Sequence, residues 1–157
     1  MLEVLLLYLI IPGRINFLQL GRYGRFGEQR YRQQFGRRFD WLSFNASLAE
    51  SQIGNRVAIA FDPSYISKSG KCTPYMGRFW SGCAKMAKRG LEISGIGLID
   101  MDLHTCFHLE AVQTPPTKTL EQVKYTLIDW YLHVLRTRKE KLLRLTNYVV
   151  ADAYFSK

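Results

Sequence analysis

The stretch Arg56-Val57-Ala58-Ile59-Ala60-Phe61-Asp62 is an apolar, partly β-branched run that ends on a carboxylate. A second stretch, Tyr148-Val149-Val150-Ala151-Asp152-Ala153-Tyr154-Phe155, repeats this design around Asp152. Apolar runs of this length are typical of strands buried on both faces of an α/β sheet. A carboxylate at the end of such a strand lies where α/β sheets bind their ligands. We therefore expect the two strands to lie side by side, with Asp62 facing Asp152.

Two aspartates held a few Å apart repel each other unless they share a divalent cation. Hard carboxylate oxygens suit Mg²⁺ or Mn²⁺. Metal ions held in this way support phosphoryl transfer, because they neutralise the entering and leaving oxygens. Asp62 and Asp152 therefore predict a magnesium- or manganese-dependent phosphoryl-transfer site.

The charge balance indicates the substrate of this site. The 157 residues include 22 Lys and Arg against 13 Asp and Glu, which gives a formal net charge of +9. An excess of this size attracts polyanions, and the binding is salt-sensitive. We expect nucleic acid as the partner, and a basic protein without a polyanionic partner is the alternative.

The cysteines and the apolar start of the chain both favour a cytoplasmic protein. Cys72, Cys83 and Cys106 show no CxxC spacing, so free thiols are expected instead of a disulfide framework or a zinc ribbon. Residues 1–11 lack a basic flank and are fewer than the roughly 20 residues that span a bilayer. We expect a core helix here, no membrane partner, and association with the nucleoid when DNA is bound.

Residues 1–50 are expected to form short helices separated by glycines, in a helix-turn-helix-like DNA-binding region. The segment 14–38 carries seven arginines and a single acid. In a helix over 28–35, the i,i+4 spacing predicts that Tyr31 and Phe35 pack inward. The alternative is a helical bundle whose arginines are merely exposed. The arginines assigned to DNA contact are Arg30, Arg32, Arg37 and Arg38.

Residues 63–90 carry six basic side chains and no acid, and four glycines indicate loops here. Aromatic residues lie between the cations. This composition can grip a phosphate backbone and stack on unpaired bases. A loop that caps the sheet with its aromatic side chains is the alternative, and both can hold. The cations assigned to DNA contact are Lys68, Lys71, Arg78, Lys85, Lys88 and Arg89.

The order of elements predicts an α/β fold. The expected elements are a helix from Asp40 to about Glu50, strands over 56–62, 91–100 and 105–113, one long helix capped by Thr117 or Thr119, and a strand that ends at Asp152. Strand-strand-strand-helix-strand over 56–157 is the leading part of a ribonuclease H-like core. Here it is incomplete and follows the small helical region.

Other titratable residues are assigned simpler roles. Glu92 and Glu110 are expected to be exposed on strand faces. Asp100-Met101-Asp102 is most simply turn chemistry. His104 and His108 would lie about 13 Å apart along a strand, which is too far for one metal ion.

Four segments carry a family resemblance: Ala60-Phe61-Asp62-Pro63-Ser64-Tyr65-Ile66-Ser67-Lys68-Ser69-Gly70-Lys71, Phe79-Trp80-Ser81-Gly82-Cys83, Gly90-Leu91-Glu92-Ile93 and Val150-Ala151-Asp152-Ala153-Tyr154-Phe155-Ser156-Lys157. Together they resemble bacterial insertion-sequence transposases of the DDE class. Residues 15–32 are similar to the N-terminal helical region of that family. The resemblance covers essentially the whole chain.

The resemblance implies a ribonuclease H-like core on which three carboxylates bind two Mg²⁺ ions. Asp62 would be the first carboxylate and Asp152 the second, each a direct metal ligand. The third is a glutamate on a helix beyond the fourth strand. The printed sequence stops at Lys157, so we expect the N-terminal part of a longer transposase, inactive in isolation.

The implied activity is cleavage and strand transfer of double-stranded DNA at insertion-sequence ends, by a homodimer assembled on DNA. Two alternatives remain open. One is a non-catalytic DNA-binding protein, a truncated transposase that acts as an inhibitor or remnant. The other is a metal-dependent nuclease of similar fold.

Overall fold

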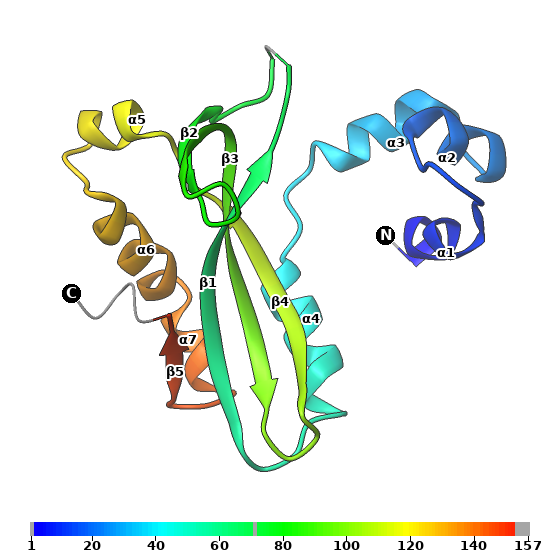
Figure 1. The fold of residues 1–157 in the computed structure, drawn as a ribbon. Helices are drawn as coiled ribbons and strands as arrows, with labels where there is room; N and C mark the ends of the chain where they lie inside the picture. The colour runs from blue at the N-terminus through cyan, green and yellow to red at the C-terminus, as the bar shows by residue number, and fades with distance from the viewer. Residues whose placement is uncertain (1, 71, 153–157) are drawn as a thin grey trace. The chain divides into compact units, whose positions relative to one another are not determined.

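The computed structural model describes residues 2–70 and 72–152, and the chain divides into two compact units, Met1–Asp40 and Trp41–Lys157. The first unit is helical, and the second contains a sheet with helices (Figure 1). The boundary falls at residue 40 instead of the expected 50. The reason is that the helix beginning at Trp41 contributes Leu42 and Ala49 to the core of the second unit.

The first unit consists of α1 (Leu2–Ile10), α2 (Phe17–Tyr23) and α3 (Glu28–Phe35). Its core is formed by Leu7, Ile11, Leu20 and Tyr31. The predicted helix over 28–35 and the inward position of Tyr31 are confirmed. The predicted burial of Phe35 is wrong, because it is the last residue of a two-turn helix and is 49% exposed, with its ring edge-on to Phe17.

A carboxylate of α1 links this helix to Arg25 and to Tyr31 of α3. Oε1 of Glu3 accepts a hydrogen bond from the backbone N–H of Arg25 and another from the hydroxyl of Tyr31, each at 2.9 Å. These bonds hold the pKa of Glu3 below its ordinary value. The first helix is therefore fixed to the segment between α2 and α3.

The second unit contains a helix, four strands, three short helices and a final strand. In chain order they are α4 (Trp41–Glu50), β1 (Val57–Ser67), β2 (Gly77–Ser81), β3 (Met86–Asp100), β4 (Thr105–Gln113), α5 (Thr117–Gln122), α6 (Leu127–Arg136), α7 (Lys139–Leu143) and β5 (Val149–Ala151). The α/β class is therefore confirmed. The strand predicted over 105–113 and the helix predicted from residue 40 to 50 are also found.

The described strands form one mixed sheet. β3 pairs antiparallel with β1 along one side and with β4 and β2 along the other, since Gly90 pairs with both Ser67 and Gly77. β5 pairs parallel with β1. The sheet order is therefore β4–β3–β1–β5, and the short β2 extends the β4 side of β3.

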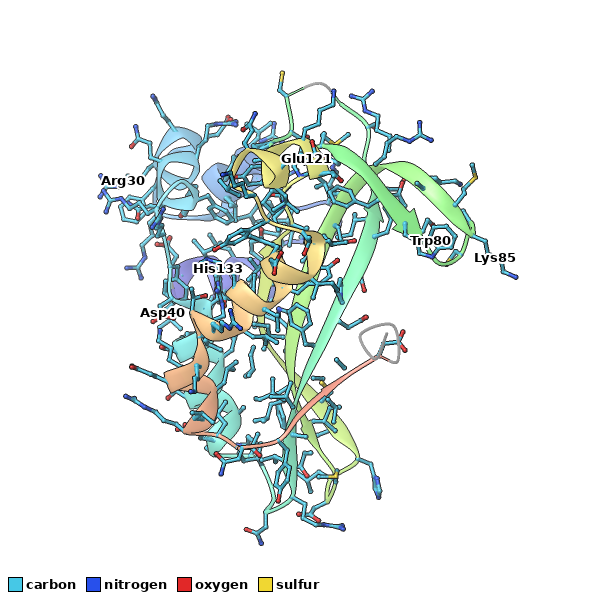
Figure 2. All side chains as sticks on the ribbon, turned by 90° about the vertical axis from the view of Figure 1, so that its left-hand side faces the viewer. Arg30, Asp40, Trp80, Lys85, Glu121 and His133 are labelled. Carbon is cyan, nitrogen blue, oxygen red and sulfur yellow. The ribbon has the colours of Figure 1, made fainter. Side chains whose placement is uncertain are left out.

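One face of the sheet, called the covered face below, carries the core. Its strand residues are Val57, Ile59, Phe61, Ile96, Leu98 and Leu109, and they pack against α4, α6 and α7 through Leu42, Ala49, Tyr131, Val134 and Leu142. Figure 2 shows these helices on one side of the strands. Leu109 is the extra residue of a β-bulge, and its carbonyl accepts a hydrogen bond from Asn45 of α4 at 2.8 Å.

Two predicted boundaries are wrong. β1 continues past Asp62 to Ser67 through Pro63, because its antiparallel pairing with β3 extends to Ser67. Within the described residues β5 pairs with Ile59–Phe61, and a proline is tolerated at a strand edge. The expected loop over 63–90 contains β2 and the start of β3. Residues 153–155 of the second apolar stretch lie outside the described residues.

The single long helix is also wrong, because three short helices occupy its place. Lys124 has a positive φ of 57°, a conformation that cannot continue the helix after α5. Thr126 then begins α6 with a capping box: its hydroxyl accepts from the N–H of Asp129, whose carboxylate accepts from the N–H of Thr126. Thr117 is the first residue of α5, and the N-cap is Pro116.

No helix within the described ranges is long and apolar enough to cross a membrane.

Candidate functional site

The candidate site lies where β1 and β5 run side by side. The parallel register pairs Ile59 with Val149, Ala60 with Val150 and Phe61 with Ala151. Asp62 follows the part of β1 that pairs with β5, Asp152 follows β5, and both residues are exposed. Neighbouring strands lie about 4.8 Å apart, and residues in register point to the same face. The predicted adjacency of the two strands is confirmed, whereas the metal-binding role of the two acids stays a prediction.

Two hydrogen bonds place β5 in this register. The N–H of Ile59 donates to the carbonyl of Tyr148 at 2.9 Å. The hydroxyl of Thr146 donates to the carbonyl of Val57, also at 2.9 Å. Just before them, α7 is anchored by the buried Leu142. The chain is therefore fixed on β1 before the strand that leads to Asp152 begins.

Asp62 lies on the second face of the sheet, called the open face below. This face carries alternate residues of three strands: Ala60, Asp62, Ser64 and Ile66 of β1, Gly95 and Gly97 of β3, and Cys106 and His108 of β4. They line a shallow hollow of about 370 Å³. Gly95 pairs directly with Asp62 and has no side chain, so the carboxylate borders free space.

The carboxylate of Asp62 has a hydroxyl neighbour. The Oγ of Ser64 donates to Oδ2 of Asp62 at 3.0 Å. Residues two apart on a strand share one face, so Ser64 is on the open face as well. Two carboxylates and a hydroxyl are the hard oxygen donors available to a cation here.

Acids at the far end of β1 serve a structural purpose. Asp100 pairs with Val57, five residues or about 17 Å along the strand from Asp62. Its carboxylate accepts from the N–H groups of Gly54 at 2.6 Å and of Asp102 and Leu103 at 2.9 Å. The turn role predicted for Asp100 is therefore confirmed, although this side chain is fully buried.

These bonds set the protonation of both turn acids. The N–H groups of Gly54 and Leu103 hold the pKa of Asp100 below its ordinary value. The guanidinium of Arg56, bonded to Asp102 at 2.6 Å, lowers the pKa of Asp102. The carboxylates of Asp100 and Asp102 are both hydrogen-bonded to neighbouring groups, and both are remote from Asp62.

The predicted exposure of Glu92 and Glu110 is wrong, because both project from the covered face. Glu92 is buried and accepts a 2.6 Å hydrogen bond from the hydroxyl of Tyr131 on α6. Glu110 forms a salt bridge with Arg138. Each acid is satisfied by a side chain that the sequence does not place near it, Tyr131 of α6 or Arg138 at the start of α7, and each lies on the face opposite Asp62.

Among residues 2–70 and 72–152, no group of three or more His, Cys, Asp or Glu side chains is placed to hold a metal ion. The described site therefore consists of the pair Asp62 and Asp152, without a third acid. His104 lies in the turn before β4 with a φ of 51°, and only His108 borders the hollow.

The cations assigned to DNA fall into both units. Arg30, Arg32, Arg37 and Arg38 are exposed in the first unit. Arg32 is engaged there, since it forms a salt bridge with Glu28 and lies over the ring of Phe17. Those exposed in the second unit are Lys68, Arg78, Lys85, Lys88 and Arg89. Lys71 lies outside the described residues.

Comparisons of this chain with protein-family models, with curated proteins and with solved structures find no match.

Proposed function

We propose that this chain supplies the first two carboxylates of a DDE-type transposase, which cleaves and joins double-stranded DNA with Mg²⁺ or Mn²⁺. The observation that carries the proposal is the parallel register of β1 and β5, which ends one residue before Asp62 and Asp152. Two distant acids reach neighbouring positions only because these strands pair in this register.

The sheet order supports a ribonuclease H-like core. Three antiparallel strands, β1, β3 and β4, are followed by β5, which is parallel to β1 on its other side. This is the order in which the carboxylate of the first core strand meets that of the fourth. The hairpin strand β2 is an addition to that order.

The donor chemistry fits a hard divalent cation. Asp62 and Asp152 would hold it, and Ser64 would orient the carboxylate of Asp62 through its 3.0 Å hydrogen bond. A bound metal of this kind supplies charge neutralisation at the phosphate that is attacked. The exposed cations of both units would bind the DNA backbone, and pairing of two element ends favours a homodimer on DNA.

Calorimetric titration with Mn²⁺ tests the proposal. We expect one weak binding event in the native chain, and its loss in both Asp62→Asn and Asp152→Asn. Glu121→Gln is the matched control, because Glu121 is an equally exposed acid on α5. Identical Mn²⁺ binding in Asp62→Asn and in the native chain would contradict the proposal.

A non-catalytic DNA-binding protein is the second candidate. It is favoured by the two exposed sets of cations together with the finding that the described residues gather only two acids at the site. Mn²⁺ binding and DNA binding by the 157-residue chain together separate the two. Mn²⁺ binding that Asp62→Asn abolishes supports the first candidate, and DNA binding without any Mn²⁺ binding supports the second.

A further inference from the structure

The hairpin formed by β2 and the start of β3 has two unlike faces. Along β2, Phe79 and Ser81 are buried while Arg78 and Trp80 are exposed. The contrast is largest between neighbours: Phe79 is 6% exposed and Trp80 is 63% exposed. An exposed tryptophan is a large apolar surface that a folded protein ordinarily buries.

The buried face fixes the direction in which Trp80 projects. The ring of Phe79 and the side chain of Pro116 lie so close over Gly77 that a Cβ there would stand 2.9 Å from each. Phe79 is therefore packed between the hairpin and the segment before α5. Since successive strand residues point to opposite faces, this packing holds Trp80 outward.

The outward face combines the indole with guanidinium groups. In the register of β2 and β3, Trp80 is opposite Ala87 and Arg78 is opposite Arg89, so these four side chains share one face. Ala87 is small and leaves the indole uncovered from its side. Arg78 reaches across the hairpin, where its Nη2 donates to the carbonyl of Ala87 at 3.2 Å.

The charged residues of the hairpin that carries Trp80 are all positive. No acid occurs in the sequence between Asp62 and Glu92. Lys85 lies in the tight turn of the hairpin, and Figure 2 shows Trp80 and Lys85 together at its outer end. In the part of the chain that the structure describes, none of the exposed cations of the hairpin forms a salt bridge. A protein interface would be poor in lysine, whereas uncompensated cations beside an aromatic ring are typical of a surface for single-stranded nucleic acid.

We propose that Trp80 stacks on an unpaired base of a nucleic-acid strand, while Arg78, Arg89 and Lys85 bind its phosphates. Positions Arg78 and Trp80 are about 7 Å apart along the strand, so one nucleotide spans the stacking ring and a flanking cation. The inference deepens the proposed function, and rests on it for the identity of the nucleic acid as DNA. It adds an unpaired base to a substrate otherwise assigned as duplex.

The test is fluorescence anisotropy of a labelled oligothymidine of about 12 nucleotides, titrated with the full chain in EDTA. Trp80→Ala is expected to weaken binding about tenfold, and Trp80→Leu equally, because leucine keeps apolar bulk without a stacking face. Trp80→Tyr is expected to stay within about twofold of the native chain. Binding of a blunt duplex should change by less than about twofold in all three variants.

Met86→Ala is the matched control, because Met86 is 51% exposed on the same hairpin and has no aromatic ring. The proposal is overturned if Trp80→Ala and Trp80→Leu bind the oligothymidine as Met86→Ala does. It is equally overturned if they change only self-association in sedimentation, which would make Trp80 a protein contact.

The absence of metal separates this result from the carboxylate site. Glu121→Gln, which lies outside the carboxylate site, should bind the oligothymidine as tightly as the native chain does in EDTA. If Trp80→Ala binds the oligothymidine as tightly as the native chain while the native chain binds Mn²⁺, only the role of Trp80 is refuted. If the native chain binds no Mn²⁺ while Trp80→Ala weakens oligothymidine binding, only the metal site is refuted.

Discussion

The two faces of the sheet differ in role: the covered face carries the core of the second unit, and the open face carries the candidate site. Along β1, Ile59 and Phe61 are buried against helices, while Asp62, Ser64 and Ile66 of the open face are exposed. A two-residue period therefore places the core and the candidate site on opposite sides of one strand. The comparison teaches that mutations on one strand should separate into effects on folding and effects on ligand binding.

The largest expected effect comes from truncating the covered face. Ile59→Ala should lower the free energy of unfolding by about 2–5 kcal/mol, because a fully buried side chain leaves a cavity. Ile66→Ala is the matched control on the open face of β1, where Ile66 is 42% exposed, and should cost about 1 kcal/mol or less. Urea unfolding measures both. Equal losses would break the division between the faces.

The next effect comes from the buried hydrogen bond between Tyr131 and Glu92. Tyr131→Phe should lower the free energy of unfolding by about 1–3 kcal/mol, because it removes a donor from a buried carboxylate. Tyr125→Phe, on a half-exposed ring, should change it by less than about 0.5 kcal/mol. If Tyr131→Phe changed the free energy of unfolding as little as Tyr125→Phe does, the hydrogen bond between Tyr131 and Glu92 would contribute little to stability.

Acid should weaken the turn at the end of β3. The pKa of Asp100 is lowered in the folded chain from an ordinary value of 3.8. The unfolded chain therefore binds the proton more readily, so this stabilisation is fully present above pH 3.8 and is lost as the pH falls toward the folded pKa. Thermal melting between neutral pH and pH 3 should show a falling midpoint. Asp100→Asn should reduce that dependence, and an unchanged slope would contradict the assigned role.

The smallest effect on folding is expected at the candidate site itself. Asp62→Asn should change the free energy of unfolding by less than about 0.5 kcal/mol, since Asp62 is exposed and its removal relieves repulsion with Asp152. Urea unfolding without metal measures this. A loss as large as that of Ile59→Ala would mean that Asp62 serves the fold and would blur the contrast between the faces.

The sequence predicts the framework well where a strong periodic signal exists. The apolar runs around Ile59 and Val150 form neighbouring strands, and the alternation in 105–113 forms β4. The expected burial of the second run is wrong, because Val149 and Val150 are exposed. Tyr31 is buried as its helical spacing predicts. These features depend on short-range patterns of burial, which a single sequence carries.

The predictions differ from the structure where contacts between residues far apart in sequence determine the local structure. Glu92 is buried because Tyr131, 39 residues away, supplies its hydrogen bond. The hairpin strand β2 is only five residues long, and its buried residue Phe79 packs near Pro116, which is far from it in sequence. The division of the expected long helix did leave a local signal, since Thr126 and Asp129 form a capping box. The alternation of Glu92 with Ser94, Ile96 and Leu98 likewise indicates the covered face.

The most direct test of the central claim is the paramagnetic effect of Mn²⁺ on the amide signals of the ¹⁵N-labelled chain. If β1 and β5 present a shared site, the amide signals of Asp62 and Asp152 should broaden together at substoichiometric Mn²⁺. In Asp62→Asn, the amide signals of residues 62 and 152 should both stay sharp. Broadening of only one of the two signals, or of neither while other acids respond, would contradict a site formed by both strands.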